Sequence, residues 1–144
     1  MKGRDEILES FKSHLARYLS SGEYSFPFNS EYIRRGAVDP NFDVLPIIYI
    51  WEDKEQVVTR NRMKERTLPI VVEAYLNPKA YDYDNDSQCI NVFLRELLII
   101  TNQFNDTNPK NPFIELENDV FYIIGDVTMM AIQVRMEVKY VTTY

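Results

Sequence analysis

One predicted strand changes character halfway along its length. In its second half, over residues 67–76, every other side chain lies on one apolar face, which is formed by Leu68, Ile70, Val72, Ala74 and Leu76. The same register continued backwards makes this face basic, with Arg60, Arg62, Lys64 and Arg66. Burial of four unpaired cations is strongly unfavourable. We therefore expect the basic half to project from the body of the protein, as an arm that contacts another molecule.

The arm is predicted to be a β-hairpin over about residues 52–66, with its base in the core and its tip in solvent. Residues 46–51 form the strand before it, because they are rich in β-branched and aromatic side chains. No Asn-Gly or Asp-Gly pair marks a tight turn, so we expect a loose tip. Pro69 has no N–H to donate to a β-ladder, which indicates an edge strand or a bulge at that position.

The remaining apolar periodicity predicts two amphipathic helices and further strands. The helices are expected over residues 4–20 and 87–104, and the strands over residues 31–35, 113–116, 120–124 and 128–142. Such an order of elements is typical of an α+β fold. We expect a mostly antiparallel sheet with two helices packed on one face and the β-hairpin arm projecting from it, in one domain over residues 1–144.

The amino-acid composition argues against several classes of protein. The chain has 22 acidic and 16 basic residues and a net charge of −6, which argues against a general nucleic-acid binder. An acidic surface would still suit the wall of a channel through which DNA slides, because it repels the phosphates and does not bind them. No apolar run approaches the ~20 residues needed to span a bilayer, and the N-terminus lacks a signal-peptide pattern. We expect a protein that is made and used in a cytoplasm.

The two most reactive side-chain types each occur once. His14 lies beside the apolar stripe of the first helix and has no recognisable nucleophile and orienting group as partners, so a structural role is favoured. Cys89, near the start of the second helix, is expected to fill the core, although a helix N-terminus can activate a thiol. We expect that the protein is not an enzyme and that it binds no cofactor.

Asp82, Asp84 and Asp86 begin like a calcium-binding loop. Ser87 and Phe93 then stand where that loop requires glycine and a bidentate glutamate, so the motif is not complete. The three aspartates are expected to provide favourable charge and capping before the second helix. A weak divalent-metal site that includes them remains an alternative.

The arm is the candidate site. Its candidate interface residues have an aromatic at the base, acids on the outgoing side and bases on the return: Trp51, Glu52, Asp53, Glu55, Arg60, Arg62, Lys64 and Arg66. The opposite charges can pair within the hairpin, at roughly 0.2–1 kcal/mol a pair. Alternatively, the arm binds a neighbouring molecule, with the tryptophan as an anchor. Contact of the bases with DNA phosphate is a third interpretation, which the nearby acids disfavour.

Five features follow one another along residues 4–140. An amphipathic helix opens with RDEIL at residue 4, and the strand LPIIYIWE, from residue 45, ends in an aromatic and an acid. A charged hairpin leads into RTLPIVVEAY at residue 66, a second helix follows, and AIQVRMEVKY at residue 131 is a long final strand. In this order the features resemble the tail terminator, or tail completion, proteins of long-tailed bacteriophages. They are patterns of core and arm rather than catalytic motifs.

The resemblance implies a structural role in the virion, with no reaction and no cofactor. Such proteins form a ring, usually of six subunits, at the head-proximal end of the tail tube. The ring stops tube polymerisation, offers a docking surface to the head connector and lets DNA pass through its lumen. The implied partners are further copies of the chain, the tube protein and the connector, and the protein is in the host cytoplasm during assembly. An arm that reaches onto a neighbour's acidic face would secure each junction of such a ring.

Three alternatives stay open. A neck or head-completion adaptor belongs to the same structural class and would carry a similar arm. A small metal-dependent hydrolase or nuclease would use Asp82, Asp84 and Asp86, and metal binding would then raise its melting temperature. A monomeric binding module would form no ring.

Overall fold

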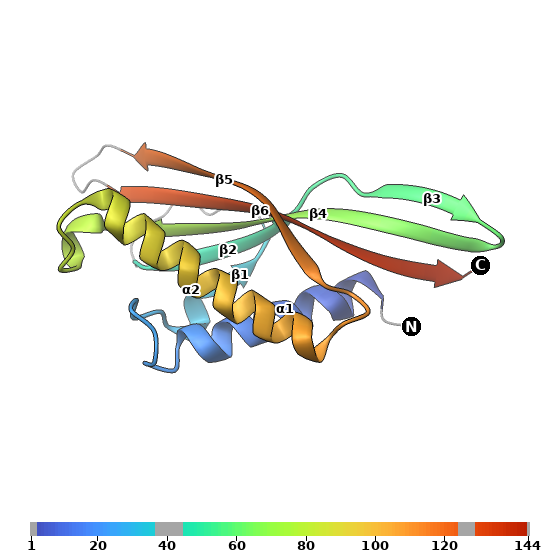
Figure 1. The fold of residues 1–144 in the computed structure, drawn as a ribbon, viewed down its shortest axis with the longest axis horizontal. Coiled ribbons are helices and arrows are strands. Elements are labelled where there is room, and N and C mark those ends of the chain that lie inside the picture. Colours follow the sequence, from blue (N-terminus) through green and yellow to red (C-terminus); the bar gives the residue numbers. More distant parts are fainter. Residues whose placement is uncertain (1–2, 37–44, 124–128, 144) are drawn as a thin grey trace.

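The computed structural model describes residues 3–36, 45–123 and 129–143, and it has an α+β fold, as predicted (Figure 1). The elements in chain order are α1 (Arg4–Leu19), η1 (Ser30–Tyr32), β1 (Ile33–Arg35), β2 (Ile47–Glu52), β3 (Gln56–Arg60), β4 (Met63–Leu76), η2 (Pro78–Ala80), α2 (Asp86–Thr107), β5 (Phe113–Ile123) and β6 (Met129–Thr143). The six strands form one sheet in the order β1-β2-β4-β6-β5, and β3 pairs with β4. The β1–β2 pair is parallel and the other described pairs are antiparallel.

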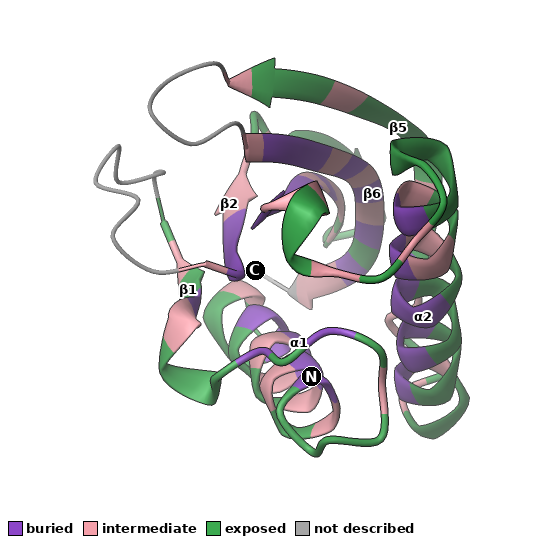
Figure 2. Ribbon diagram, turned by 90° about the vertical axis from the view of Figure 1, so that its left-hand side faces the viewer, coloured by how far each residue is buried: buried purple, intermediate pink, exposed green. Residues whose placement is uncertain are grey.

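The two helices pack on one face of the sheet, as the sequence predicted (Figure 1). The buried apolar residues of α1 and α2 form one cluster with the even-numbered residues 68–76 of β4 and 130–140 of β6. At its centre the ring of Phe11 stacks on Phe113 with centroids 4.0 Å apart and meets Phe104 edge-on at 5.4 Å. Figure 2 shows the helices with their buried sides turned inward. No helix in the described ranges is long and apolar enough to cross a bilayer.

The prediction of an edge strand at Pro69 is wrong, because β4 is a central strand of the sheet. It pairs with β6 along its whole length, from Met63 opposite Thr143 to Leu76 opposite Met130. On its other side, β2 pairs with β4 as far as residue 70, and β3 pairs with β4 from residue 67. Residues 53–55 connect these two strands opposite residues 68 and 69, so three residues face two, which agrees with the bulge that was the other alternative. The N–H of Asp53 donates to the carbonyl of Pro69 at 2.9 Å. The N–H and C=O of one residue point to the same side of a strand, so the missing donor of Pro69 faces this interruption of the ladder.

The tip of the β3–β4 hairpin is a tight two-residue turn, and the prediction of a loose tip is therefore wrong. Asn61 and Arg62 have φ angles of 47° and 66°, which is the left-handed backbone that two-residue hairpins require. Asparagine adopts this backbone readily, while arginine does so at a cost. The turn also places Arg60 on β3, so the four bases do not share one face of one strand.

Replacing Arg62 with glycine is expected to raise the free energy of unfolding by about 0.5–1 kcal/mol. Glycine relieves the left-handed backbone and loses part of that gain through its freedom in the unfolded chain. Urea unfolding measures the change. Arg62→Ala is the control, because it removes the same charge and keeps the Cβ. An equal gain in the alanine variant would assign the effect to charge and contradict the backbone explanation.

Two strands predicted near the C-terminus are one. The structure has a continuous 11-residue strand, β5, with a register shift between Glu115 and Glu117. The polar residues 117–119 were expected to break the strand, but they stay paired with β6, because a bulge at a sheet edge accommodates one extra residue. The predicted strand at residues 31–35 is reduced to Ile33–Arg35 after a 3-10 turn. Ile124 and Thr128, which two predictions included, lie outside the described residues.

Candidate functional site: the sheet extension

The charged segment predicted as a two-stranded arm belongs to a three-stranded part of the sheet. Strand β3 pairs with one side of β4 at residues 63–67, and residues 139–143 of β6 pair with the other side. In Figure 1 these segments lie at one end of the molecule, beyond the helices. We call them the sheet extension. A free-standing hairpin at residues 52–66 is therefore not confirmed, because β6 forms the third strand.

The outer strand β3 and the tip of the extension combine exposed apolar and basic side chains. Val57 is 45% exposed, Val58 50% and Met63 41%. Arg60 and Arg62 are exposed beside them. Arg60 lies 4.0 Å from Glu65, and an ion pair between two such exposed groups contributes little stability. The tip therefore presents apolar surface that does not belong to the core of this chain, next to positive charge.

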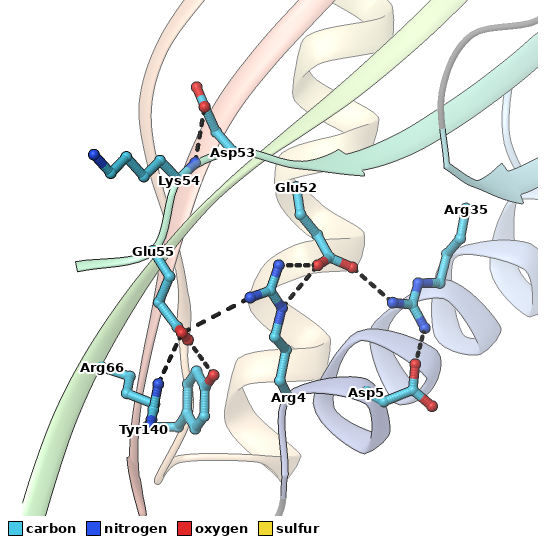
Figure 3. A network of polar contacts seen from close by, with 9 residues as sticks. All are labelled: Arg4, Asp5, Arg35, Glu52, Asp53, Lys54, Glu55, Arg66 and Tyr140. Carbon is cyan, nitrogen blue, oxygen red and sulfur yellow. Dashed lines mark hydrogen bonds and ion pairs between the residues drawn. The ribbon is translucent and has the colours of Figure 1, made fainter. Parts of the chain in front are cut away.

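Glu52, at the end of β2, links the first helix to the sheet (Figure 3). Its carboxylate accepts hydrogen bonds from Nε of Arg4 at 2.7 Å and from Nη2 of Arg35 at 2.7 Å. Arg35 also donates to Asp5 at 2.7 Å and to Glu9 at 3.0 Å, both on α1. Burial raises the pKa of Glu52, but the hydrogen bonds from Arg35 and Arg4 outweigh it, so this pKa lies below its usual value.

Glu55 fixes the base of the extension from the link between β2 and β3 (Figure 3). Its side chain is only 12% exposed and accepts hydrogen bonds from Nη1 of Arg66 at 3.0 Å and from the hydroxyl of Tyr140. Arg4 lies 3.7 Å away, and Nε of Arg66 donates to Oγ1 of Thr142 at 2.9 Å. Burial and the bond to Glu55 raise the pKa of Tyr140 to about 12. The expectation that Arg66 projects unpaired is therefore wrong.

The eight predicted interface residues thus have different positions. Glu52, Glu55 and Arg66 hold the base, and of these Glu55 and Arg66 pair within the hairpin as one interpretation expected. Arg60 and Arg62 lie at the tip, Lys64 is half-buried on β4, and Asp53 accepts a bond from the N–H of Lys54 at 2.8 Å. The partners Arg4 and Arg35 were missed. An arginine in the first turn of a helix opposes the helix dipole, and that signal could have indicated an acidic partner for Arg4.

Trp51 lies on the face of the sheet opposite the helices. It packs, half-buried, against a small cluster formed by Ile47, Tyr49, Tyr75 and Ala131. Its Nε1 is buried and has no hydrogen-bond partner among the described residues. The tryptophan is thus at the base of the extension and partly covered by its own chain. Its predicted role as an interface anchor remains a prediction.

Cys89 is part of the packed interior, and His14 lies half-buried beside it. Nε2 of His14 donates to the carbonyl of Ile100 at 3.0 Å, and its ring lies 4.6 Å from Tyr18 and 5.2 Å from Phe104. Burial lowers the pKa of His14, against the opposite effect of that hydrogen bond. Cys89 is buried in the main core, as predicted, and burial raises the pKa of its thiol.

The three aspartates are exposed and do not converge. Asp86 accepts a bond from the hydroxyl of Tyr122 at 3.1 Å, and the cap of α2 is Asn85, whose side chain accepts from the N–H of Gln88 at 2.9 Å. Within residues 3–36, 45–123 and 129–143, no three His, Cys, Asp or Glu side chains are grouped so that they could hold a metal ion.

The edge strand β5 is a surface that the sequence analysis missed. Among the described strands it pairs with β6 alone, and Figure 2 shows it largely exposed along the outside of the sheet. Its large exposed apolar residues are Ile114, Leu116, Phe121 and Tyr122. Glu115, Glu117 and Asp119 lie between them along the chain, and the strand has no basic residue. The register with β6 places Glu117 and Asp119 on the same face as Phe121. The alternation of apolar residues and acids over residues 114–117 was the available signal that the strand continues past residue 116.

The tip and β5 are therefore two surfaces with exposed apolar side chains, and these lie beside mostly basic residues at the tip and beside acidic residues on β5. Both are suited to binding rather than to packing within one subunit. No protein-family model matches the chain, and no curated protein is significantly similar to it.

Proposed function

We propose that this chain is a structural assembly protein of a bacteriophage, a tail terminator. In this role, copies form a ring, hexameric by resemblance to that family, at the head-proximal end of the tail tube. The ring stops tube polymerisation and provides the docking surface for the head or neck connector. DNA passes through its lumen, and no reaction or cofactor is involved.

The sheet extension is the observation that carries the proposal. Its outer strand β3 exposes Val57 and Val58, and Met63 is exposed at the start of β4. Both strands reach beyond the helices here (Figure 1), so the helices do not cover these side chains. The base of the extension is held by hydrogen bonds of Glu55 to β4 and β6. A surface fixed in this way loses little conformational entropy when it binds, which favours association. The order of helices and strands along residues 4–140, on which the resemblance rests, adds support.

Negative-stain electron microscopy tests the proposal directly. The purified protein is imaged alone and after mixing with tail tubes assembled without a terminator. We expect rings, or a cap on one end of each tube and no further growth. A monomer in solution is compatible with the proposal if caps form on tubes. Particles that stay small and leave the tubes growing would contradict it.

Reversing the charge at the tip is expected to weaken ring or cap formation without unfolding the subunit. The variant is Arg62→Glu with Lys64→Glu. The control, Lys79→Glu with Lys110→Glu, changes the net charge equally at two exposed positions outside the extension. Microscopy counts rings and caps, while thermal unfolding monitors the fold. Unchanged assembly of the tip variant, or equal loss in the control, would refute a specific role for the tip.

A further inference from the structure

The edge strand β5 has the features of an acceptor for another strand. Edge strands of soluble proteins are commonly short or are protected by charged residues, proline or a bulge. β5 has 11 residues and no lysine or proline, and its protection consists of three acids and a bulge at Leu116, which is 56% exposed. Such an edge disfavours another acidic strand and can still accept a basic one. Beyond the bulge, Glu117, Asp119 and Phe121 lie on one face and Val120 and Tyr122 on the other, so an added strand would meet both acidic and apolar positions.

A second copy of β5 is not a suitable partner for it. Pairing two β5 strands would join two edges that each carry three acids and no base, and like charges on paired strands are destabilising. The complementary strand is at the tip of the sheet extension. There β3 exposes Val57 and Val58, and Arg60 and Arg62 supply positive charge at its end.

The topology prevents the two strands from pairing within one subunit. β5 lies at the β6 side of the sheet, whereas β3 lies on the β2 side of β4. Among the described strands each has one neighbour, so each leaves one edge available. Two different, complementary edges on opposite sides of a sheet give a head-to-tail contact, which closes into a ring or continues as a filament.

We infer that β3 of one copy adds to β5 of the next, and that this strand pairing joins the copies in the assembly. The inference rests on the proposed function and names the two surfaces that form its junction. Main-chain hydrogen bonds give the contact its affinity. The apolar residues of the two strands cover one another, and Arg60 and Arg62 lie against Glu117 and Asp119, which sets partner choice and orientation.

Photo-cross-linking of the full chain tests this pairing. The photoreactive amino acid p-benzoylphenylalanine replaces Val58 in one sample and Ser13, an exposed residue of α1, in the control. Both samples are irradiated over a range of protein concentrations, with and without tail tubes, and mass spectrometry maps the cross-linked residues. We expect the probe at residue 58 to capture residues 113–123 of a second copy, and the control probe not to.

A charge exchange provides an independent readout. Arg60→Glu in the probe-bearing chain is expected to reduce the cross-link to β5, and Asp119→Lys in the other chain is expected to restore it. Capture of other residues, or no intermolecular product in any sample, would overturn the pairing. Rings without capture of β5 would overturn the pairing and leave the proposed function standing. Capture of β5 without rings or caps would support the pairing and contradict the terminator role.

Discussion

Replacing Phe11 with alanine is expected to lower the free energy of unfolding by about 3–5 kcal/mol. Phe11 is fully buried and stands where both helices meet the sheet, stacked on Phe113 of β5 and edge-on to Phe104 of α2. The substitution removes both aromatic contacts and leaves a cavity between three elements that cannot all move inward. Urea unfolding followed by circular dichroism measures the loss.

Phe121→Ala is the matched control for this prediction. It removes the same atoms from a residue of β5 that is about half exposed, so it is expected to cost at most about 1 kcal/mol in dilute protein. Comparable losses for the two variants would mean that residue 11 is not at the centre of the core. A small loss for Phe11→Ala alone would show that the surrounding side chains collapse into the cavity.

The helices and the inner strands could be predicted because, in each of them, the buried residues recur with the period of the helix or strand. The spacing of Ile7, Leu8 and Phe11 places them on one side of the helix, and this side is the one buried against the sheet. The alternation over residues 68–76 survives as the helix-facing side of β4. Such a periodicity depends only on which side of the element is buried, so it can be recognised without knowing which strand pairs with which.

The extension could not be predicted, because its structure depends on a strand more than 70 residues away. The local sequence predicted a solvated hairpin over about residues 52–66. In the structure the end of β6 lies along β4, and Arg66 is partly buried and donates a hydrogen bond to Thr142. The tight turn was missed for a related reason. Asn-Arg is a weak hairpin signal, and the long ladder between β4 and β6 favours a turn that a short isolated hairpin would not hold.

The polar base of the candidate site shows the same limit. Glu52 was predicted to belong to a hairpin interface, whereas its partner Arg4 is 48 residues away on another element. Charge patterns within a segment cannot reveal such partners. What the sequence did indicate was an excess of charge at the end of an apolar strand, and the structure divides that charge between a fixed base and an exposed tip.

Replacing Glu52 with glutamine is expected to lower the free energy of unfolding by about 1.5–3 kcal/mol at neutral pH. Glutamine keeps the size and an acceptor oxygen, but Arg4 and Arg35 lose the negative charge to which both donate. Glu65→Gln is the control, since that carboxylate pairs with Arg60 at 4.0 Å in solvent, and its loss is expected to cost no more than about 0.5 kcal/mol. Thermal and urea unfolding give the two differences.

The pH dependence gives this prediction a second, independent measurement. Because the folded-state pKa of Glu52 is lower than its usual 4.5, the carboxylate stabilises the folded state fully above that pH. The stabilisation is lost as the pH falls through the lowered pKa, where the wild-type side chain becomes neutral like glutamine. The difference between wild type and Glu52→Gln should therefore be constant near neutral pH and shrink in acid. A difference that is the same at all pH values would mean that the carboxylate contributes shape rather than charge, and that the two arginines are stabilised by other groups.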